Sequence, residues 1–297
     1  IRDLFGILKP NGYRQFNTAY IEIPKKNGKS ELAAAVALLL TCGDGEQRAE
    51  VYGAAADRQQ ASIVFDVAAD MVRMCPALNK RVKILASQKR LVYEPTNSFY
   101  QVLSAEAYSK HGYKPSCVIF DELHAQPNRE LWDVMTFGAG SGRKQPVWIV
   151  LTTAGDDPDR KSIGWEIHQQ AVAIRDARQL RRIREKGGNV RQVLSLRHVE
   201  DEDLAAAEED LLEQDMPNWM PVLYGLTAIF GDDPDDLDQI DIWDENLWYL
   251  CNPSLGKHLK LRTLRLEARS AKLKEADEKL FRWLRLNQWI STKSVSW

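Results

Sequence analysis

The clearest chemical pattern in the chain is an eight-residue segment near its start, Ile23-Pro24-Lys25-Lys26-Asn27-Gly28-Lys29-Ser30. It has the Gly-Lys-Ser ending of a phosphate-binding loop, but Ile23 stands where such a loop normally has its first glycine. Backbone N–H groups of such a loop hold phosphate oxygens at the start of a helix, where the helix dipole favours negative charge. We therefore expect residues 24–30 to bind a nucleotide, with Lys29 reaching the β- and γ-phosphates and the Ser30 hydroxyl binding Mg²⁺. The alternative is an ordinary strand-to-helix turn in which Gly-Lys-Ser is a coincidence.

A pair of carboxylates ends an apolar segment farther along the chain, Cys117-Val118-Ile119-Phe120-Asp121-Glu122. A Walker B element requires such a strand, because the carboxyl end of a parallel strand lies beside the phosphate loop. Asp121 would hold Mg²⁺ through the water shell of the ion, and Glu122 would orient and polarise the attacking water. The pair lies about 90 residues after the Gly-Lys-Ser segment, a spacing often found in such sites. The alternative is an Asp-Glu pair that caps the following helix.

A third apolar segment ends in hydroxyl groups, Val150-Leu151-Thr152-Thr153-Ala154-Gly155. In many P-loop motors the strand between the loop and the Walker B strand ends in a polar group that senses the γ-phosphate. We expect Thr152 and Thr153 to contact that phosphate or the attacking water. The alternative is a turn rich in Thr and Gly.

The elements that would position these residues alternate between strands and helices up to about residue 195. Strands are predicted at 19–23, 49–55, 82–85, 90–93, 99–103, 116–120 and 146–152, and helices at 31–40 and 57–74. The continuous apolar character of the strands at 116–120 and 146–152 is typical of a parallel sheet covered on both faces. The sequence therefore predicts an α/β doubly wound fold.

The rest of the chain differs in composition. A basic helix is predicted from Ile167 to Lys186, and acidic runs follow at 200–215 and 232–245. A last helix is predicted from Leu261 to Trp289, with an apolar stripe along one side. The basic helix could follow DNA phosphates, or it could simply be a solvated charged face. The acidic runs are expected to be solvated surface.

Composition excludes several other classes of protein. The chain has 297 residues, of which 44% are hydrophobic, and a net charge of −2, so any contact with DNA would have to be local. Four cysteines form no CxxC pair, and five histidines have no metal-ligand spacing, which argues against zinc and against a disulfide framework. No apolar run is close to the length needed to span a membrane, and no signal peptide is visible. Since the chain opens on Ile1 and stops at Trp297, we expect it to be part of a longer protein.

Five segments in this order point to one family. They are the Ile23–Ser30 loop, Phe120-Asp121-Glu122, Leu151-Thr152-Thr153-Ala154-Gly155, Cys251-Asn252-Pro253-Ser254-Leu255-Gly256 and Arg285-Leu286-Asn287-Gln288-Trp289. Together they resemble the large terminase subunit of tailed double-stranded DNA bacteriophages, the motor that pumps the genome into the prohead. The resemblance covers nearly the whole chain. The last two segments discriminate best, because a generic ATPase has no reason to carry them.

The resemblance implies a P-loop NTPase of the RecA/ASCE-like type that hydrolyses ATP with Mg²⁺. Residues 1–195 would be the ATPase core, and residues 196–297 a small, mainly helical lid or linker leading toward a nuclease domain. Because the strand-borne aspartates of such a nuclease are not found here, no nuclease activity is expected. The implied partners are double-stranded DNA, a portal protein, a small terminase subunit and further copies in a ring, in the host cytoplasm and without a membrane.

Three residues have open roles. Terminases of this kind usually lack the first loop glycine and often carry, at the position of Lys25, an arginine that acts on the γ-phosphate from within the same subunit. Lys25 could act in its place or be a solvated surface lysine, since lysine lacks the bidentate fork of arginine. Arg143, in a Gly-rich loop, is a candidate arginine finger for a neighbouring subunit. His124 is expected to be a structural partner.

Two other functions compete with the DNA translocase. The sequence Asp121-Glu122-Leu123-His124 occurs in one class of helicases, but such an enzyme needs a second RecA-like domain, for which residues after His124 offer no candidate. A nucleotide-binding assembly protein without turnover is the other alternative. Glu122 argues against it, since a catalytic carboxylate would have no purpose there.

Overall fold

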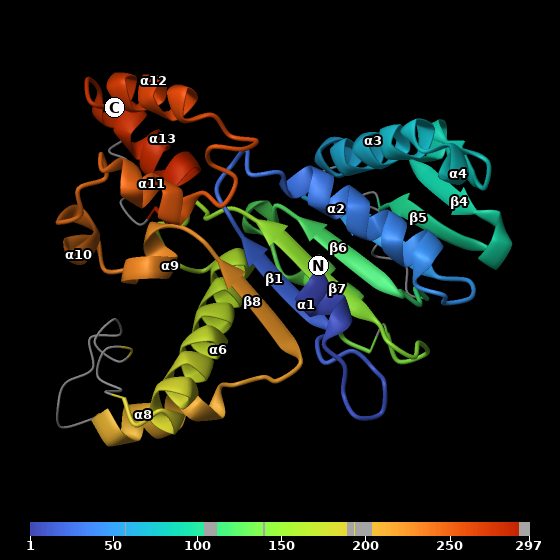
Figure 1. Cartoon of the computed structure of the whole chain (residues 1–297), viewed down its shortest axis with the longest axis horizontal. Helices are drawn as coiled ribbons and strands as arrows, with labels where there is room; N and C mark the ends of the chain where they lie inside the picture. The colour runs from blue at the N-terminus through green and yellow to red at the C-terminus, as the bar shows by residue number, and fades with distance from the viewer. Residues whose placement is uncertain (57, 104–111, 139, 189–192, 194–203, 291–297) are drawn as a thin grey trace. The chain divides into compact units, whose positions relative to one another are not determined.

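The computed structural model describes residues 1–56, 58–103, 112–138, 140–188, 193 and 204–290 (Figure 1). The chain forms two compact units, the first made of residues 1–21 and 28–152 and the second of residues 22–27 and 153–297. The chain therefore passes from one unit to the other inside the phosphate-binding loop, between Asn27 and Gly28. The predicted domain boundary at 195 and 196 falls outside the described residues and stays a prediction.

The first unit carries most of the predicted strands. Its elements are α1 (Arg2–Gly6), β1 (Thr18–Glu22, whose last residue belongs to the second unit), α2 (Lys29–Leu38), the π-helix η1 (Leu39–Gly43), β2 (Glu50–Ala54), α3 (Arg58–Met74), α4 (Pro76–Asn79), β3 (Val82–Leu85), the 3-10 helix η2 (Ala86–Gln88), β4 (Arg90–Tyr93), the 3-10 helix η3 (Glu94–Thr96), β5 (Ser98–Val102), β6 (Cys117–Asp121), the 3-10 helix η4 (Leu123–Ala125), α5 (Glu130–Thr136) and β7 (Val147–Thr152).

These strands form a mixed, largely parallel sheet in the order β3-β4-β5-β2-β6-β7-β1. β2 pairs in parallel with β5 and β6, and β6 pairs in parallel with β7, whereas β4 is antiparallel to both β3 and β5. All five residues of β6 are buried, as expected for a central parallel strand. The predicted α/β sheet is confirmed, and β7 lies between the Walker B strand β6 and the loop strand β1.

Small residues allow the helix after the loop to lie close to the sheet. Ala33, Ala34 and Ala37 on α2 are fully buried, and α2 contacts both β6 and β7. α2 and α3 run side by side over the sheet in Figure 1. The helix predicted at 31–40 begins earlier, at Lys29, because Gly28 adopts a left-handed conformation (φ 85°) that only glycine adopts readily and so starts the helix there.

The second unit is mainly helical. Its elements are α6 (Ile163–Glu185), α8 (Leu204–Glu213), β8 (Trp219–Leu223), α9 (Leu226–Phe230), α10 (Pro234–Asp238), α11 (Glu245–Cys251), α12 (Leu261–Ala271) and α13 (Glu275–Leu286). An apolar cluster around Trp248, Leu264 and Phe281 joins the last helices.

The single helix predicted from Leu261 to Trp289 is wrong. The chain instead forms α12 and α13, separated by a tight turn at 272–274 in which the N–H of Leu273 bonds to the carbonyl of Ser270. Both helices are amphipathic, and folding back lets their apolar faces bury Leu264, Ala268 and Phe281 in one cluster. α13 ends before Trp289, since Asn287 takes a left-handed conformation (φ 55°).

Several basic side chains of α6 are paired within the second unit. Arg178 and Arg181 both contact Asp215, and Arg184 lies 3.4 Å from Glu208 of α8. Three arginines of this helix, for which DNA contact was one of two alternatives, are therefore paired with carboxylates. The exposed Asp232, Asp235 and Asp236 flank and begin the short helix α10, in agreement with their assignment as surface.

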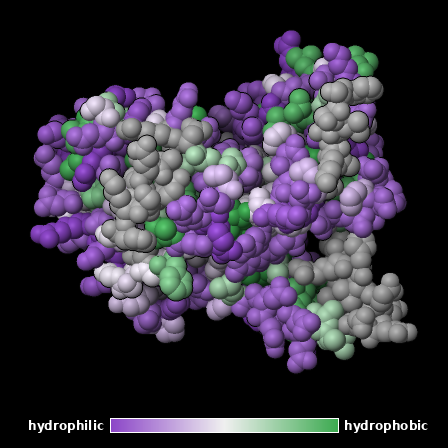
Figure 2. Space-filling view, turned by 180° about the vertical axis from the view of Figure 1, so that it is seen from behind, coloured by the Kyte–Doolittle hydropathy of each residue, from purple (hydrophilic) through white to green (hydrophobic). Residues whose placement is uncertain are grey.

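The surface is predominantly polar on the face shown in Figure 2, where hydrophobic residues appear in small groups. Among the described residues, no helix is both long and apolar enough to cross a membrane.

Candidate active site

The phosphate-loop lysine and the Walker B glutamate meet in the first unit. Lys29 is the first residue of α2, and its Nζ lies 3.8 Å from Oε1 of Glu122. Their side chains are only 8% and 16% exposed. The N–H groups in the first turn of an α-helix have no partner within the helix, so the start of α2 offers donors to an anion beside the Lys29 ammonium.

Glu122 has an unusual backbone conformation. Its φ of 51° is left-handed, although it is not a glycine, and it follows the last residue of β6. Its N–H donates to the carbonyl of Leu151 in β7 at 2.9 Å, which fixes the turn to the neighbouring strand. A strained residue of this kind persists only where its surroundings hold it, and such residues concentrate at functional sites.

Asp121 is a buried carboxylate, 4% exposed, at the end of β6. Burial and then the charge of Glu122 raise its pKa to about 7, although Lys29 and the N–H of Glu122 act in the opposite direction. A cation bound beside this carboxylate would favour its charged form and lower its pKa.

The donor set fits Mg²⁺. Asp121 and the Ser30 hydroxyl are both oxygen ligands, and Mg²⁺ is usually held by one or two carboxylates, waters and substrate phosphates rather than by a full protein cage. In the part of the chain that the structure describes, no group of three or more His, Cys, Asp or Glu residues could hold a metal by itself. A metal at Asp121 would therefore depend on phosphate oxygens for part of its coordination.

His124 also lies in this site, whereas the sequence predicted only a structural role for it. Its Nδ1 lies 3.2 Å from Oε2 of Glu122 and 3.1 Å from Oγ1 of Thr152, and its backbone N–H also donates to Oγ1 of Thr152 at 3.3 Å. The turn η4 brings His124 back toward Glu122. The signal in the sequence was a histidine two residues after the carboxylate, but its link to Thr152 comes from the pairing of β6 with β7.

The two threonines predicted as sensors are adjacent in sequence but belong to different units. Thr152 ends β7 in the first unit and contacts His124, whereas Thr153 is the first residue of its segment in the second unit and is fully buried. The structure therefore brings Thr152 to Glu122 through His124, and the role of Thr153 stays a prediction.

The remaining loop residues belong to the second unit. Lys25 Nζ lies 5.8 Å from the centre of the Trp283 ring, and the exposed Lys26 has a left-handed backbone (φ 69°). Pro24 and Asn27 are buried. Lys25 is thus only partly exposed and contacts an aromatic ring, and its predicted action on the γ-phosphate stays untested.

Arg143 contacts acidic residues of its own unit. Its guanidinium lies 3.5 Å from Glu46 and 3.2 Å from Glu50, and Nε donates to the carbonyl of Lys114 at 2.7 Å. Its side chain is 11% exposed. A finger for a neighbouring subunit would have to leave these contacts, so this role also stays a prediction.

Several known proteins are similar to this chain. The model of the family described as terminase large subunit, ATPase domain, matches residues 2–168. The large terminase subunit of Enterobacteria phage HK97 is 34% identical over 148 residues, which are 49% of this chain and 29% of that protein. The crystal structure of the HK97 bacteriophage large terminase has a TM-score of 0.64 and 25% identity, covering 94% of this chain and 47% of that chain. The chain therefore spans less than half the length of these relatives. The resemblance carried by the motifs and the P-loop NTPase fold are confirmed.

Proposed function

Because the chain belongs to the family of terminase large subunit ATPase domains, we propose that it binds ATP with Mg²⁺ and hydrolyses it. The observation that carries the proposal is the approach of Lys29 to Glu122 within 3.8 Å, with Asp121 next to Glu122 at the end of β6. A phosphate-binding lysine beside a potential base and a potential metal ligand is the arrangement that phosphoryl transfer to water requires.

Each side chain has a distinct role in this proposal. Lys29 neutralises the β- and γ-phosphates. Ser30 and Asp121 would hold Mg²⁺, which would supply positive charge against the charge that develops on the phosphates. Glu122 orients the attacking water and accepts its proton. His124 and Thr152 hold the Glu122 carboxylate in place through the contacts of 3.2 and 3.1 Å.

Lys25 has a narrower proposed role, the neutralisation of γ-phosphate charge from within the same chain. Its ammonium supplies charge but no bidentate fork. Lys25→Met should lower turnover, and Lys25→Arg should preserve or raise it. Equal turnover in the wild type and both variants would show that Lys25 has no part in hydrolysis.

The whole protein, of which this chain covers one part, is proposed to use ATP hydrolysis to move double-stranded DNA into a prohead. This proposal rests on the relatives named terminase large subunit. The proposed partners are DNA, a portal protein, a small terminase subunit and further copies in a ring in the host cytoplasm. We further propose residues 1–195 as the ATPase core and 196–297 as the lid or linker, with nuclease activity outside this chain.

Phosphate release by the purified chain tests the ATPase proposal. We expect Mg²⁺-dependent turnover in the wild type, and near-complete loss in Glu122→Gln with ATP binding retained. Lys29→Ala should lose both binding and turnover. Equal background rates in the wild type and Glu122→Gln, with ATP bound by both, would favour the assembly protein without turnover.

DNA movement needs a separate experiment. Packaging by the full-length subunit with proheads and ATP should be abolished by Glu122→Gln. Hydrolysis by the full-length subunit that never moves DNA into proheads would contradict the translocase.

A further inference from the structure

The first arm of the phosphate loop is anchored by Asn27, whose side-chain amide makes three hydrogen bonds. Asn27 Nδ2 donates to Oδ1 of Asn252 at 2.8 Å and to the carbonyl of Pro24 at 3.2 Å. Asn27 Oδ1 accepts the backbone N–H of Ser254 at 3.0 Å, and the Ser254 hydroxyl donates to the Asn27 carbonyl at 3.0 Å. All these residues belong to the second unit.

Asn252 connects this arm to two helices. It is 1% exposed, and its Nδ2 donates to the carbonyl of Trp248 in α11 at 3.0 Å and to that of Arg285 in α13 at 2.8 Å. Because both Nδ2 hydrogens point to carbonyls, Oδ1 is left to accept from Asn27. The orientation of the amide is therefore set by its surroundings.

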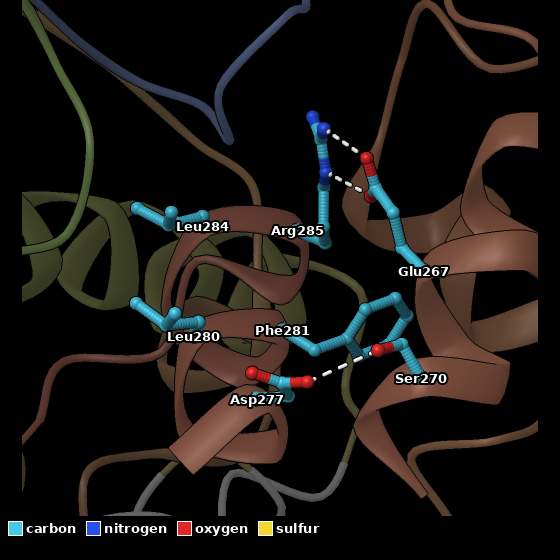
Figure 3. Close-up of a pocket in the computed structure, with 7 residues that line it drawn as sticks. All are labelled: Glu267, Ser270, Asp277, Leu280, Phe281, Leu284 and Arg285. Carbon is cyan, nitrogen blue, oxygen red and sulfur yellow. Dashed lines mark hydrogen bonds and ion pairs between the residues drawn. The ribbon is translucent and has the colours of Figure 1, made fainter. Parts of the chain in front are cut away.

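The end of α13 holds the neighbouring loop residue. The N–H of Lys25 donates to the carbonyl of Leu284 at 3.1 Å, and Nη1 of Arg285 donates to the carbonyl of Lys25 at 3.3 Å. Figure 3 shows Arg285 also forming a two-pronged pair with Glu267 of α12, at 2.5 and 2.6 Å. Glu267 thus holds Nε and Nη2 of the guanidinium, while Nη1 contacts the loop.

The Asn-Pro-Ser-Leu-Gly segment has a shape suited to this contact. The N–H of Leu255 donates to the carbonyl of Asn252 at 3.0 Å, which closes a turn with Pro253 at its second position. Leu255 is 6% exposed and anchors the turn, while Gly256 (φ 84°) allows the chain to leave it. The turn presents the N–H and hydroxyl of Ser254 to Asn27.

The loop needs such an anchor because its backbone is strained. Lys26 has a left-handed conformation (φ 69°) and Gly28 follows with φ 85°, one on each side of Asn27. A non-glycine residue in this conformation costs on the order of 1 kcal/mol or more, and the surrounding contacts must maintain it. Left-handed positions in a loop turn successive N–H groups toward one anion.

We propose that Asn252 and Ser254 are positioning residues that hold the Pro24–Asn27 arm of the loop in its phosphate-binding conformation through Asn27. This inference rests on the proposed ATP binding. It gives a role to the Asn-Pro-Ser-Leu-Gly segment, which contributes no group to the chemistry itself.

Steady-state hydrolysis and the affinity for a non-hydrolysable ATP analogue test this role. Asn252→Ala should raise both KM for ATP and Kd for the analogue about tenfold, the equivalent of about 1.4 kcal/mol, and leave kcat within about twofold, because bound nucleotide restores the loop. Ser254→Ala, which loses one hydroxyl contact of a half-buried side chain, should raise both about threefold without a risk to folding. Asn246→Ala is the matched control, since Asn246 is exposed and its side chain donates to the neighbouring Asp244.

A double-mutant cycle tests the path through Asn27. If Asn252 acts through Asn27, then Asn27→Ala combined with Asn252→Ala should weaken analogue binding no more than the worse single variant. Additive losses would overturn the proposal. It would also be overturned if Asn252→Ala and Ser254→Ala lowered kcat in proportion to the folded fraction and left KM and Kd unchanged, since that is the result of a merely structural role.

The two proposals can fail separately. A wild-type chain that binds the analogue but shows no turnover would contradict ATP hydrolysis, while the effect of Asn252→Ala on Kd would still decide the positioning role. A wild type with turnover that depends on Lys29, combined with unchanged KM and Kd in Asn252→Ala and Ser254→Ala, would remove only the positioning role.

Discussion

His124 Nδ1 lies 3.1 Å from the Thr152 hydroxyl and 3.2 Å from a carboxylate oxygen of Glu122. The ring therefore links the end of β7 to the proposed base at the end of β6. Since all three side chains belong to the first unit, this link is a property of the sheet itself. A change in the position of β7 relative to β6 would move the carboxylate that orients water.

Removal of the Thr152 hydroxyl should therefore slow hydrolysis without weakening nucleotide binding. Thr152→Val keeps the shape of this buried side chain but leaves Nδ1 and the backbone N–H of His124 without their shared partner. We expect a loss in kcat of about tenfold, equivalent to about 1.4 kcal/mol. Thr152→Ser, which keeps the hydroxyl, is the control and should retain most activity. Full activity in Thr152→Val, or equal losses in both variants, would contradict a role that is specific to the hydroxyl.

Asp121 should make the chain without nucleotide and Mg²⁺ less stable as the pH rises. Its pKa in the folded chain is about 7, above the ordinary value of 3.8, so between these pH values the folded state binds more protons than the unfolded state. The free energy of unfolding should therefore fall by up to about 1.4 kcal/mol per pH unit from pH 4 to 7 and level off above.

The variant Asp121→Asn removes this titration. Thermal unfolding from pH 4 to 8 should show a flatter pH dependence and a higher Tm at pH 8 than in the wild type, together with lost ATP turnover. The same slope in both proteins would mean that another group is responsible.

Gly225 should not tolerate a side chain. Its φ of 132° is rare for other residues, and a Cβ there would lie 2.5 Å from Cβ of Asn287 and 2.8 Å from the carbonyl oxygen of Leu286. Gly225→Ala should destabilise the chain by about 3 kcal/mol or more, because backbone as well as side chain would have to move. Gly142→Ala, where a Cβ meets no atom within 4 Å, should change stability little. Chemical denaturation of both variants measures the difference, and a Gly225→Ala chain as stable as the wild type would contradict the close approach to Asn287.

Arg143 has two possible roles: ion pairs within its own chain, or an arginine finger for a neighbouring subunit. Its pairs with Glu46 and Glu50 predict that Arg143→Ala lowers Tm in the isolated chain, by an amount corresponding to about 1 kcal/mol for partly buried pairs. A finger in trans would instead leave the basal rate of the isolated chain intact and remove the stimulation that assembly provides. Turnover measured in the isolated chain and in the assembled packaging motor separates the two roles.

The sequence by itself determined the chemistry of the loop and of the Walker B strand. Lys29 and Ser30 follow a strand and begin a helix, and Asp121 and Glu122 end an apolar strand. These placements depend on local pattern only, because a buried strand and a helix start are both encoded within a few residues. The strand ending at Thr152 was predicted for the same reason.

Tertiary structure alone decided how these pieces are joined. No local pattern states that β7 lies between β6 and β1, that His124 therefore reaches Thr152, or that Asn252 bonds to Asn27 across 225 positions of sequence. The same holds for the turn that splits the predicted helix at 261–289, since this turn lets Leu264 and Phe281 be buried in one cluster. Such contacts join segments that are distant in sequence, and they stabilise the protein only after folding has brought those segments together. The sequence supplied the reacting groups, and the fold supplied the residues that hold them in position.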